Sequence, residues 1–295
     1  MNDKICTLTF DNSAEQAKLF SQVLNINCEL VHSRKFPDEE ILLSIPPALP
    51  EHVVMFRSLH QPNDKIIEIL LAAKTARKHN AKRITLIAPY LCYMRQDIEN
   101  KPGEAISQQI IGELFANTFD DVITVDSHLH RIDHLDQAIP IENAINIMAT
   151  DPMSDFLEKQ CPNTIIFGPD GESEQWVSEI AENIGGEFAV AQKVRRGDKS
   201  VKIEIPDKDF NGKDITIVDD MASTGRTIAL ATQLLKQAGA KSVNALVTHA
   251  LFMGDAKNHM IKNGVENIWS TDTISDPSNK IQLHKLLADS FKTIL

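Results

Sequence analysis

Short apolar runs alternate with amphipathic segments along almost the whole chain. The run ITIV at 215–218 is too short for a helix and rich in β-branched residues, so it predicts a buried strand. Other segments carry apolar residues at helical spacing, and Ser13 and either Asn63 or Asp64 are candidate caps for two of these helices. We expect strands near 5–10, 28–32, 41–45, 53–57, 83–89, 121–126, 163–167, 188–192, 214–218 and 243–248, and helices near 13–24, 63–80, 104–117, 151–159, 172–183, 227–238 and 281–294.

This alternation of strands and helices predicts an α/β protein with mostly parallel sheets covered by helices on both faces. The segments NAKRITLIAPY at 80–90 and GAKSVNALVTH at 239–249 resemble each other, which indicates an internal duplication. We therefore expect two similar domains, 1–145 and 146–295, joined near 143–150, and we allow for the final helix packing on the first domain. A hairpin is expected around Asn211-Gly212-Lys213.

Composition and charge narrow the classes of partner and compartment. The chain has 295 residues and a formal net charge of -11, which opposes nucleic acid or an anionic membrane as its main partner. Its four cysteines are scattered without CxxC spacing, as expected for free thiols in a reducing compartment. The sequence shows neither a signal-peptide pattern nor an apolar run long enough to span a bilayer. We expect a cytoplasmic protein.

The stretch DITIVDDMASTGRT at 214–227 combines a predicted strand with a candidate binding site. It places Asp219 and Asp220 at the strand end, before a turn of small and hydroxyl-bearing residues and the start of a helix. A helix start favours phosphate, whereas adjacent carboxylates suit sugar hydroxyls or a divalent cation. The stretch therefore predicts a sugar-phosphate site, although an ordinary capped helix after a strand shares its pattern of residue types.

Polar loops also follow four other predicted strands: PYLCYMRQD, DSHLHRIDH, GPDGES and KVRRGDKSVK. Ligands of open α/β sheets bind at these carboxyl ends of strands. Because the whole chain is acidic, the cations of KVRRGDKSVK indicate a flap over phosphate rather than a solvated face. HLHRIDH approaches the HxHxDH pattern of metallo-hydrolases, but one extra residue separates His130 from Asp133. No GxxxxGK(S/T) motif is present, so a P-loop is excluded.

The segments FPDEE, PYLCYMRQD, VDSH, GPD, KVRR and VDDMASTGRT follow one another in an order that resembles ribose-phosphate pyrophosphokinases, especially archaeal-type members. The resemblance implies two type I phosphoribosyltransferase-like domains. It also implies transfer of the diphosphate group of ATP to O1 of ribose 5-phosphate, giving 5-phosphoribosyl 1-diphosphate (PRPP) and AMP for nucleotide biosynthesis. The 214–227 stretch by itself resembles the PRPP-binding motif of phosphoribosyltransferases.

The resemblance also assigns roles to individual residues. Lys193 and Arg195 would be the catalytic pair, and His128 and Asp170 would be associated with Mg²⁺. A homo-oligomer, at least a dimer, is implied because the adenine contacts of the family usually come from a neighbouring subunit. The residues implied for ATP are Phe36, Asp38, Glu40, Arg95, Gln96, Asp97 and His128; those implied for ribose 5-phosphate are Asp219, Asp220, Ser223, Thr224, Gly225, Arg226 and Thr227.

Several positions depart from the usual pattern of this family: Glu39, 98–100, Ser127, 171–173 and Arg226. They leave donor preference and regulation open. A non-catalytic regulatory subunit and a PRPP-consuming phosphoribosyltransferase are the alternatives. The first has no chemical need for the implied catalytic pair, and the second would need only the 214–227 stretch.

Overall fold

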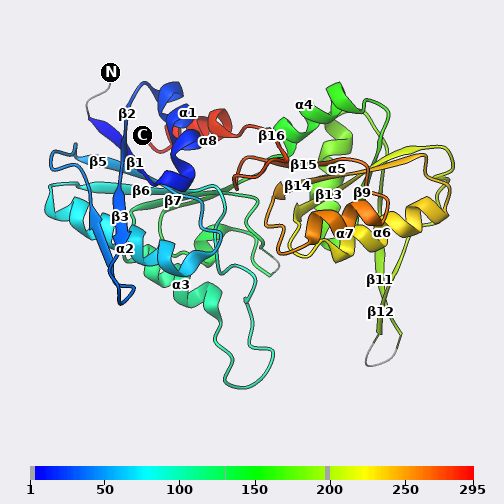
Figure 1. The fold of residues 1–295 in the computed structure, drawn as a ribbon, viewed down its shortest axis with the longest axis horizontal. Coiled ribbons are helices and arrows are strands. Elements are labelled where there is room, and N and C mark those ends of the chain that lie inside the picture. Colours follow the sequence, from blue (N-terminus) through cyan, green and yellow to red (C-terminus); the bar gives the residue numbers. More distant parts are fainter. Residues whose placement is uncertain (1–3, 130, 197–199) are drawn as a thin grey trace. The chain divides into compact units, whose positions relative to one another are not determined.

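The structure is a computed structural model that describes residues 4–129, 131–196 and 200–295, without the side chains of 193–203. The chain divides into two compact units (Figure 1). Unit 1 comprises Met1–Ile147 and Leu283–Leu295, and unit 2 comprises Met148–Gln282. No helix in the described part of the chain has both the length and the apolar character of a membrane span.

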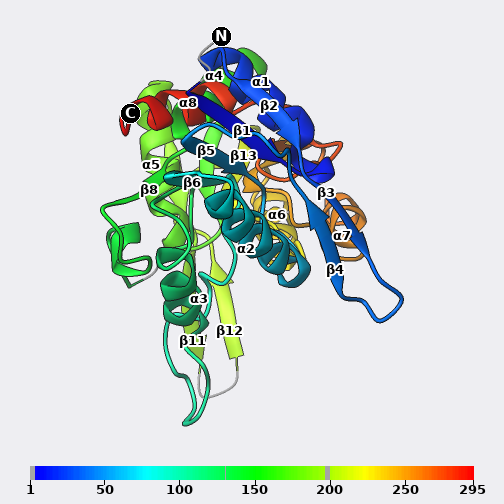
Figure 2. The same cartoon turned by 90° about the vertical axis from the view of Figure 1, so that its left-hand side faces the viewer.

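The described residues of unit 1 form a parallel six-stranded sheet in the order β2-β1-β5-β6-β7-β8. Helices α1 and α8 cover one face of it, and α2 and α3 lie on the other (Figure 1). A separate antiparallel hairpin, β3–β4, extends from the unit (Figure 2). The elements are β1 (Ile5–Thr9), α1 (Ala14–Leu24), β2 (Asn27–Leu30), β3 (His32–Lys35), β4 (Ile41–Ser44), β5 (His52–Phe56), α2 (Pro62–Lys78), β6 (Arg83–Ala88), α3 (Ser107–Ala116), β7 (Asp121–Val125), β8 (Asn143–Ile147) and α8 (His284–Lys292), with 3-10 turns η1 (Asp11–Ser13) and η2 (Leu135–Gln137).

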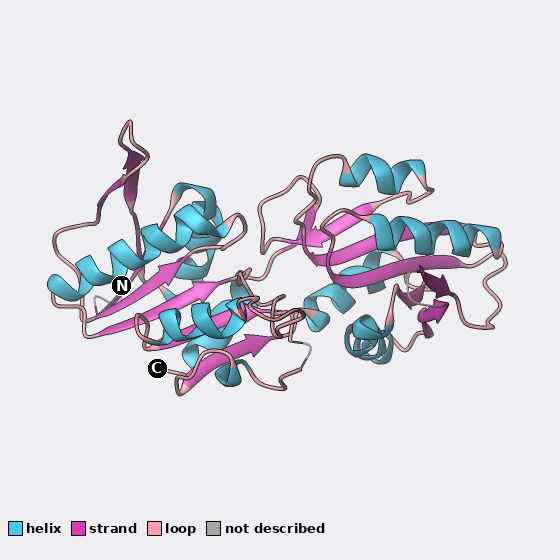
Figure 3. Cartoon of the chain, turned by 90° about the horizontal axis from the view of Figure 1, so that it is seen from below, coloured by secondary structure: helices cyan, strands magenta, loops and turns pink. Residues whose placement is uncertain are grey.

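Unit 2, over its described residues, has a second parallel six-stranded sheet in the order β10-β9-β13-β14-β15-β16. Helices again flank the strands, as Figure 3 shows by colour. A second antiparallel hairpin, β11–β12, stands outside the sheet. The elements are α4 (Thr150–Gln160), β9 (Ile165–Gly168), η3 (Gly171–Ser173), α5 (Glu174–Asn183), β10 (Phe188–Val190), β11 (Gln192–Arg196), β12 (Ser200–Glu204), β13 (Asp214–Met221), α6 (Arg226–Gln237), β14 (Ser242–His249), α7 (Ala256–Lys262), β15 (Ile268–Thr271) and β16 (Asn279–Ile281).

The two sheets have the same topology. In each, the second strand in sequence lies at one edge, beside the first, and a hairpin outside the sheet precedes the third strand. Strands β6 and β14, which contain the similar segments 80–90 and 239–249, each occupy the fourth place. The predicted duplication and the predicted α/β fold class are confirmed.

Burial explains why these apolar runs form strands. Residues 84–88 of β6 and 215–218 of β13 are fully buried, as expected for parallel strands covered on both faces. The C-terminal helix α8 is held in unit 1 by Phe291, whose buried ring lies 5.8 Å, centroid to centroid, from that of Phe20 in α1. Burying such a ring contributes about 1.5–3 kcal/mol.

One predicted cap is correct only in position, and the other is wrong. Ser13 is the N-cap residue of α1, but its hydroxyl accepts a hydrogen bond from Ser58 N and does not bond to the helix. Helix α2 begins earlier than expected, at Pro62, after Gln61 in the left-handed region. The Asn63 side chain accepts a hydrogen bond from the Tyr93 hydroxyl, and Asp64 forms an ion pair with Lys35. The side chains that the local sequence assigns to helix ends therefore bond to residues distant in the chain instead.

The expected hairpin around Asn211-Gly212-Lys213 is also wrong. These residues form a turn whose Gly212 N donates to Gly239 O, and the turn leads into β13. The hairpin of this region is β11–β12, formed by the basic loop itself. The expected join near 143–150 contains β8, which pairs with β7 over Asn143–Ile147. The elements that were not predicted are the strands β3, β8, β11, β12, β15 and β16 and the short helix α7.

Candidate active site

The strand order of unit 2 reverses direction at β9 and β13. Strand β10 lies on one side of β9, and β13 with the later strands lies on the other. The chain leaves these two neighbouring strands toward opposite sides, so a crevice is expected outside their carboxyl ends. Asp170 follows β9, and Asp219 and Asp220 lie near the end of β13. The topology thus brings the predicted metal-associated residue and the predicted ribose residues to one sheet edge.

These carboxylates crowd one another. Burial, together with the negative charges of Asp220 and Asp170, raises the pKa of Asp219 well above its ordinary value. One Asp219 oxygen accepts a hydrogen bond from Asp220 N at 3.1 Å. Asp170 accepts one from Glu172 N at 3.0 Å and so begins the turn η3. A cluster of this kind is stabilised by a cation or by hydroxyl donors.

The loop between β13 and α6 contains the predicted phosphate residues. Backbone hydrogen bonds fasten it to the segment after β14: Ala222 N donates to His249 O at 3.2 Å, and Met253 N donates to Ser223 O at 2.8 Å. Ser223 is partly exposed, Thr224 is exposed and Thr227 lies in the first turn of α6. The loop is therefore held in place while its hydroxyl groups stay near the surface.

Gly225 ends this loop and precedes α6 with φ +69° and no side-chain cap. A Cβ here would lie 2.9 Å from Met260 Cγ and 3.1 Å from the Ala256 carbonyl oxygen, both in α7. Glycine is thus required both by its backbone conformation and by the close approach of α7. Arg226 is the first residue of α6 and is exposed. The first N–H groups of α6 point toward the loop, as in anion-binding helix starts.

The predicted catalytic pair lies on the hairpin of unit 2. Lys193 and Arg195 belong to β11 and pair with Ile203 and Val201 of β12. Their side chains are outside the described part of the structure, as are Gly197 and Lys199 in all respects. Their roles therefore stay predictions.

In unit 1, the loops after two neighbouring strands contain four of the predicted ATP residues. Arg95, Gln96 and Asp97 lie in the loop between β6 and α3, and His128 follows β7, which pairs with β6. The first loop is held from α3, since Gln108 N donates to Gln96 O at 3.1 Å. The carboxyl ends of these two strands bring the RQD loop and the histidine loop to the same sheet edge.

Phe36, Asp38 and Glu40 lie at the tip of the β3–β4 hairpin (Figure 2). Phe36 N donates to Glu40 O at 2.8 Å, and Glu39 between them has φ +70°. Glycine adopts such a left-handed conformation more readily than glutamate does. Phe36 is 38% exposed, and the centroid of its ring lies 4.7 Å from the Arg34 guanidinium carbon. The hairpin thus presents an aromatic ring to its surroundings.

The equivalent switch point of unit 1 has a different chemistry. Phe56 pairs with Ile87 as Val218 pairs with Leu246, and the two partner residues occupy the same place in the similar segments. Arg57, the next residue, therefore corresponds to Asp219. Its buried guanidinium carbon lies 3.8 Å from the centre of the Phe10 ring, and the group forms an ion pair with Glu68. Of these two equivalent places, only that of unit 2 has the carboxylate pair.

The metallo-hydrolase hypothesis gains no support from the geometry. His130 lies outside the described residues. Across the rest of the chain, over the residues that the structure describes, no group of three or more His, Cys, Asp or Glu side chains is arranged to hold a metal ion.

One contact at the edge of unit 1 was not predicted. Arg131 Nη1 donates to both carboxylate oxygens of Asp97, each at 2.8 Å. Arg131 belongs to the HLHRIDH stretch, in which the sequence pattern indicated a role only for histidine and aspartate. The two residues are 34 positions apart, so no local spacing could reveal the pair.

Comparison with known families covers nearly the whole chain. Residues 5–118 match a family model described as the N-terminal domain of ribose phosphate pyrophosphokinase. Residues 136–285 match a model described as a phosphoribosyl transferase domain. The boundary between the matches falls within unit 1, before β8.

Individual proteins agree with these models. The chain is 34% identical over 265 residues to a ribose-phosphate pyrophosphokinase of Saccharolobus solfataricus, covering 86% of this chain and 88% of the relative. It is 28% identical over 291 residues to that of Methanopyrus kandleri, covering 97% and 98%. The crystal structure of phosphoribosylpyrophosphate synthetase from Mycobacterium smegmatis shares the fold, with a TM-score of 0.84, 22% identity and coverage of 99% and 98%. The chain belongs to the ribose-phosphate pyrophosphokinase family.

Proposed function

We propose that this protein transfers the diphosphate group of ATP to O1 of ribose 5-phosphate, giving PRPP and AMP for nucleotide biosynthesis. The observation that carries the proposal is the pairing of crowded carboxylates with a helix-start loop at the switch point of unit 2. Membership of the family supports it further.

The acceptor site combines two kinds of contact. Asp219 and Asp220 would accept hydrogen bonds from the ribose hydroxyls, which relieves the crowding of their charges. The loop from Ser223 to Thr227 would donate to the 5-phosphate through hydroxyl and backbone N–H groups. Arg226, exposed at the first position of α6, would add a cation beside that phosphate.

The donor side is proposed on the loops of unit 1. Arg95 and Gln96 would hold the phosphates of ATP, and Asp97 and His128 would complete the nucleotide site at the same sheet edge. The exposed ring of Phe36, with Asp38 and Glu40, would contact adenine in a neighbouring subunit. We therefore expect a homodimer or a larger homo-oligomer.

The proposed reaction is an in-line displacement. O1 of ribose 5-phosphate attacks the β-phosphorus, the bond from that phosphorus to the α,β-bridging oxygen breaks, and the electron pair leaves with AMP while O1 loses its proton. Little covalent chemistry is required of the protein in such transfers, because alignment and charge stabilisation supply most of the catalysis. Lys193 and Arg195 of β11 would neutralise charge on the transferred group.

Mg²⁺ is the proposed cofactor. The carboxylates of Asp170, Asp219 and Asp220 are hard oxygen donors, but these described side chains do not by themselves form a group arranged to hold a metal ion. Mg²⁺ would therefore be held largely by substrate phosphates, with one or two of these carboxylates as further ligands. Mg²⁺, when bound, would supply charge neutralisation for the polyphosphate. The residues predicted for it are Asp170 in unit 2 and His128 in unit 1. The protein groups would still orient both substrates.

The test is an assay of the purified protein with Mg²⁺, ATP and ribose 5-phosphate. We expect AMP and PRPP in equal amounts. Lys193→Ala should abolish turnover while nucleotide binding, measured by calorimetry, is retained. If both substrates bind and no AMP forms, the proposal is wrong; if Lys193→Ala turns over normally, the proposed catalytic pair is wrong.

A further inference from the structure

Arg131 connects the two loops of unit 1 to which the donor site is assigned. It lies after β7, three residues beyond His128, whereas its partner Asp97 lies in the loop after β6. Both carboxylate oxygens of Asp97 accept from the same nitrogen, Nη1. The pair therefore joins the RQD loop to the histidine loop.

Burial within the pair is unequal. The Asp97 side chain is 7% exposed, whereas that of Arg131 is 55% exposed. Arg131 gives this nearly buried carboxylate a positively charged hydrogen-bond partner. Without it, a negative side chain beside the triphosphate would repel the donor. A guanidinium has five N–H donors, and the contact with Asp97 involves only the two on Nη1.

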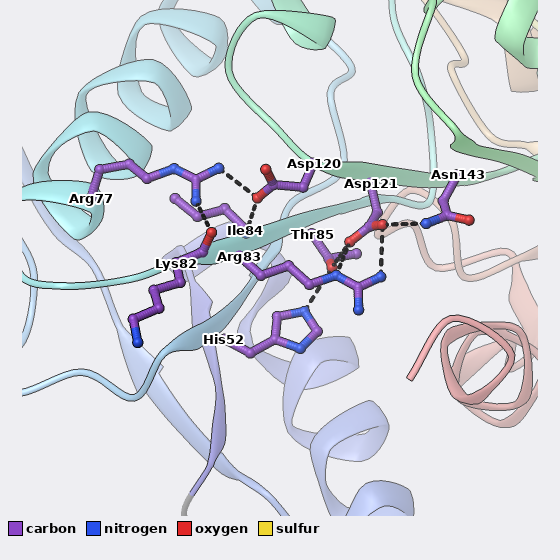
Figure 4. A network of polar contacts seen from close by, with 9 residues as sticks. All are labelled: His52, Arg77, Lys82, Arg83, Ile84, Thr85, Asp120, Asp121 and Asn143. Carbon is purple, nitrogen blue, oxygen red and sulfur yellow. Dashed lines mark hydrogen bonds and ion pairs between the residues drawn. The ribbon is translucent and has the colours of Figure 1, made fainter.

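Other ion pairs of unit 1 show what a purely structural role looks like. Figure 4 shows Arg77 of α2 and Arg83 of β6 beside the first residues of β6 and β7. The RQD and histidine loops follow the other ends of these two strands. Arg83 binds Asp121, which also accepts from Thr85 and Asn143, and so ties neighbouring strands together. Arg77 binds Asp120, which also accepts from Ile84 N in β6. The Arg131–Asp97 pair instead joins two loops at the carboxyl ends of strands.

We propose that Arg131 is a positioning residue of the nucleotide site: it fixes the Asp97 carboxylate and cancels its charge, so that the RQD loop can receive the polyphosphate of the donor. This inference rests on the proposed function. It assigns Arg131 no contact with the reacting atoms. Its effect is exerted through Asp97 and through the relative placement of the RQD and histidine loops.

The test compares Arg131→Ala with Arg131→Lys and with the matched control Arg77→Ala, which removes an arginine–aspartate pair at the other sheet edge. Losing one charge-assisted contact predicts a rise in the KM for ATP of about ten- to hundredfold in Arg131→Ala. The KM for ribose 5-phosphate should stay within about twofold, because that site is assigned to unit 2. Arg131→Lys should recover part of the loss, since it keeps the charge without the planar fork. Arg77→Ala should leave both constants unchanged.

A binding measurement separates this inference from the proposed function. Calorimetric titration with Mg-ATP, without ribose 5-phosphate, should show the same loss of affinity in Arg131→Ala. Combining it with Asp97→Asn should give less than the product of the two single effects, because both disturb one contact. If Arg131→Ala binds Mg-ATP like the wild type, or if Arg77→Ala loses as much affinity, the inference is wrong. If the wild type binds Mg-ATP but forms no PRPP, the proposed function fails instead.

Discussion

Gly225 offers the sharpest test of how the phosphate loop is built. In Gly225→Ala the new methyl group would meet Met260 Cγ at 2.9 Å and the Ala256 carbonyl oxygen at 3.1 Å. The carbonyl belongs to the backbone of α7 and cannot turn aside. Gly212 is a matched control, because it has the same φ of +69° but no heavy atom within 4 Å of the position that a Cβ would take. Both substitutions share the backbone cost, and only one adds a clash.

The magnitudes follow from this difference. A left-handed alanine costs about 1 kcal/mol relative to glycine, which is the whole expected loss for Gly212→Ala. Overpacking against α7 adds about 1–3 kcal/mol for Gly225→Ala. Both tryptophans, Trp176 and Trp269, lie in unit 2 with these glycines, so urea unfolding followed by tryptophan fluorescence reports the relevant unit. The free energies of unfolding of the two variants should differ by the overpacking cost alone.

The clash in Gly225→Ala should also move the phosphate loop, and this movement should change catalysis. Shifting the loop by a few tenths of an ångström disturbs the donors to the 5-phosphate, so the KM for ribose 5-phosphate should rise about tenfold or more in Gly225→Ala. Gly212→Ala should keep the wild-type KM. Equal destabilisation of the two variants, together with an unchanged KM, would refute the argument that α7 sets the shape of this loop.

Three further predictions concern buried charges. Burial and the neighbouring carboxylates raise the pKa of Asp219, so the folded protein loses stability as pH rises above the ordinary aspartate value of about 4. Asp219→Asn should therefore raise the melting temperature at pH 7 but not below pH 4, and it should slow transfer. A variant no more stable than the wild type at pH 7 would contradict this. Burial lowers the pKa of Lys65 to about 8, so the free energy of unfolding should rise with pH between about 8 and 10. Lys65→Met should remove that rise, and at pH 7 it should gain up to roughly 3 kcal/mol, less the free energy of the lost bond to the Ser58 carbonyl. Urea titrations at pH 7 and between about pH 8 and 10 would measure both effects. Arg57→Met should cost about 3–5 kcal/mol of folding stability, because Glu68 would lose its ion-pair partner. The double variant Arg57→Met/Glu68→Leu should recover most of this stability. A double variant as unstable as the single one would argue against the ion pair.

Sequence patterns predicted the elements whose burial is continuous. The runs in β6 and β13 are buried along almost their whole length, and their apolar composition reflects this. Strand β8 (NAINI) is only partly buried, and β16 has three residues, so neither has a distinctive pattern. Helix α7 has seven residues, which is too few to establish a helical period.

The candidate site divides in the same way. The carboxylate pair of Asp219 and Asp220 was visible because strand, turn and helix follow one another directly in the sequence. The Arg131–Asp97 contact was not, because it joins loops far apart in the chain. The correspondence of Arg57 with Asp219 required the register of both sheets. A tertiary contact likewise explains Ser13, whose hydroxyl accepts a hydrogen bond from Ser58 N rather than from a backbone N–H of α1.

The most direct test of the proposed transfer follows the β-phosphorus of ATP. Protein supplied with Mg²⁺, ribose 5-phosphate and ATP labelled with ³²P at the β-position should place all the transferred label in the diphosphate of PRPP. The AMP formed alongside should carry none, because the bond broken lies between the β-phosphorus and the α,β-bridging oxygen. Label recovered in ADP or in free diphosphate, without labelled PRPP, would contradict diphosphate transfer to ribose 5-phosphate.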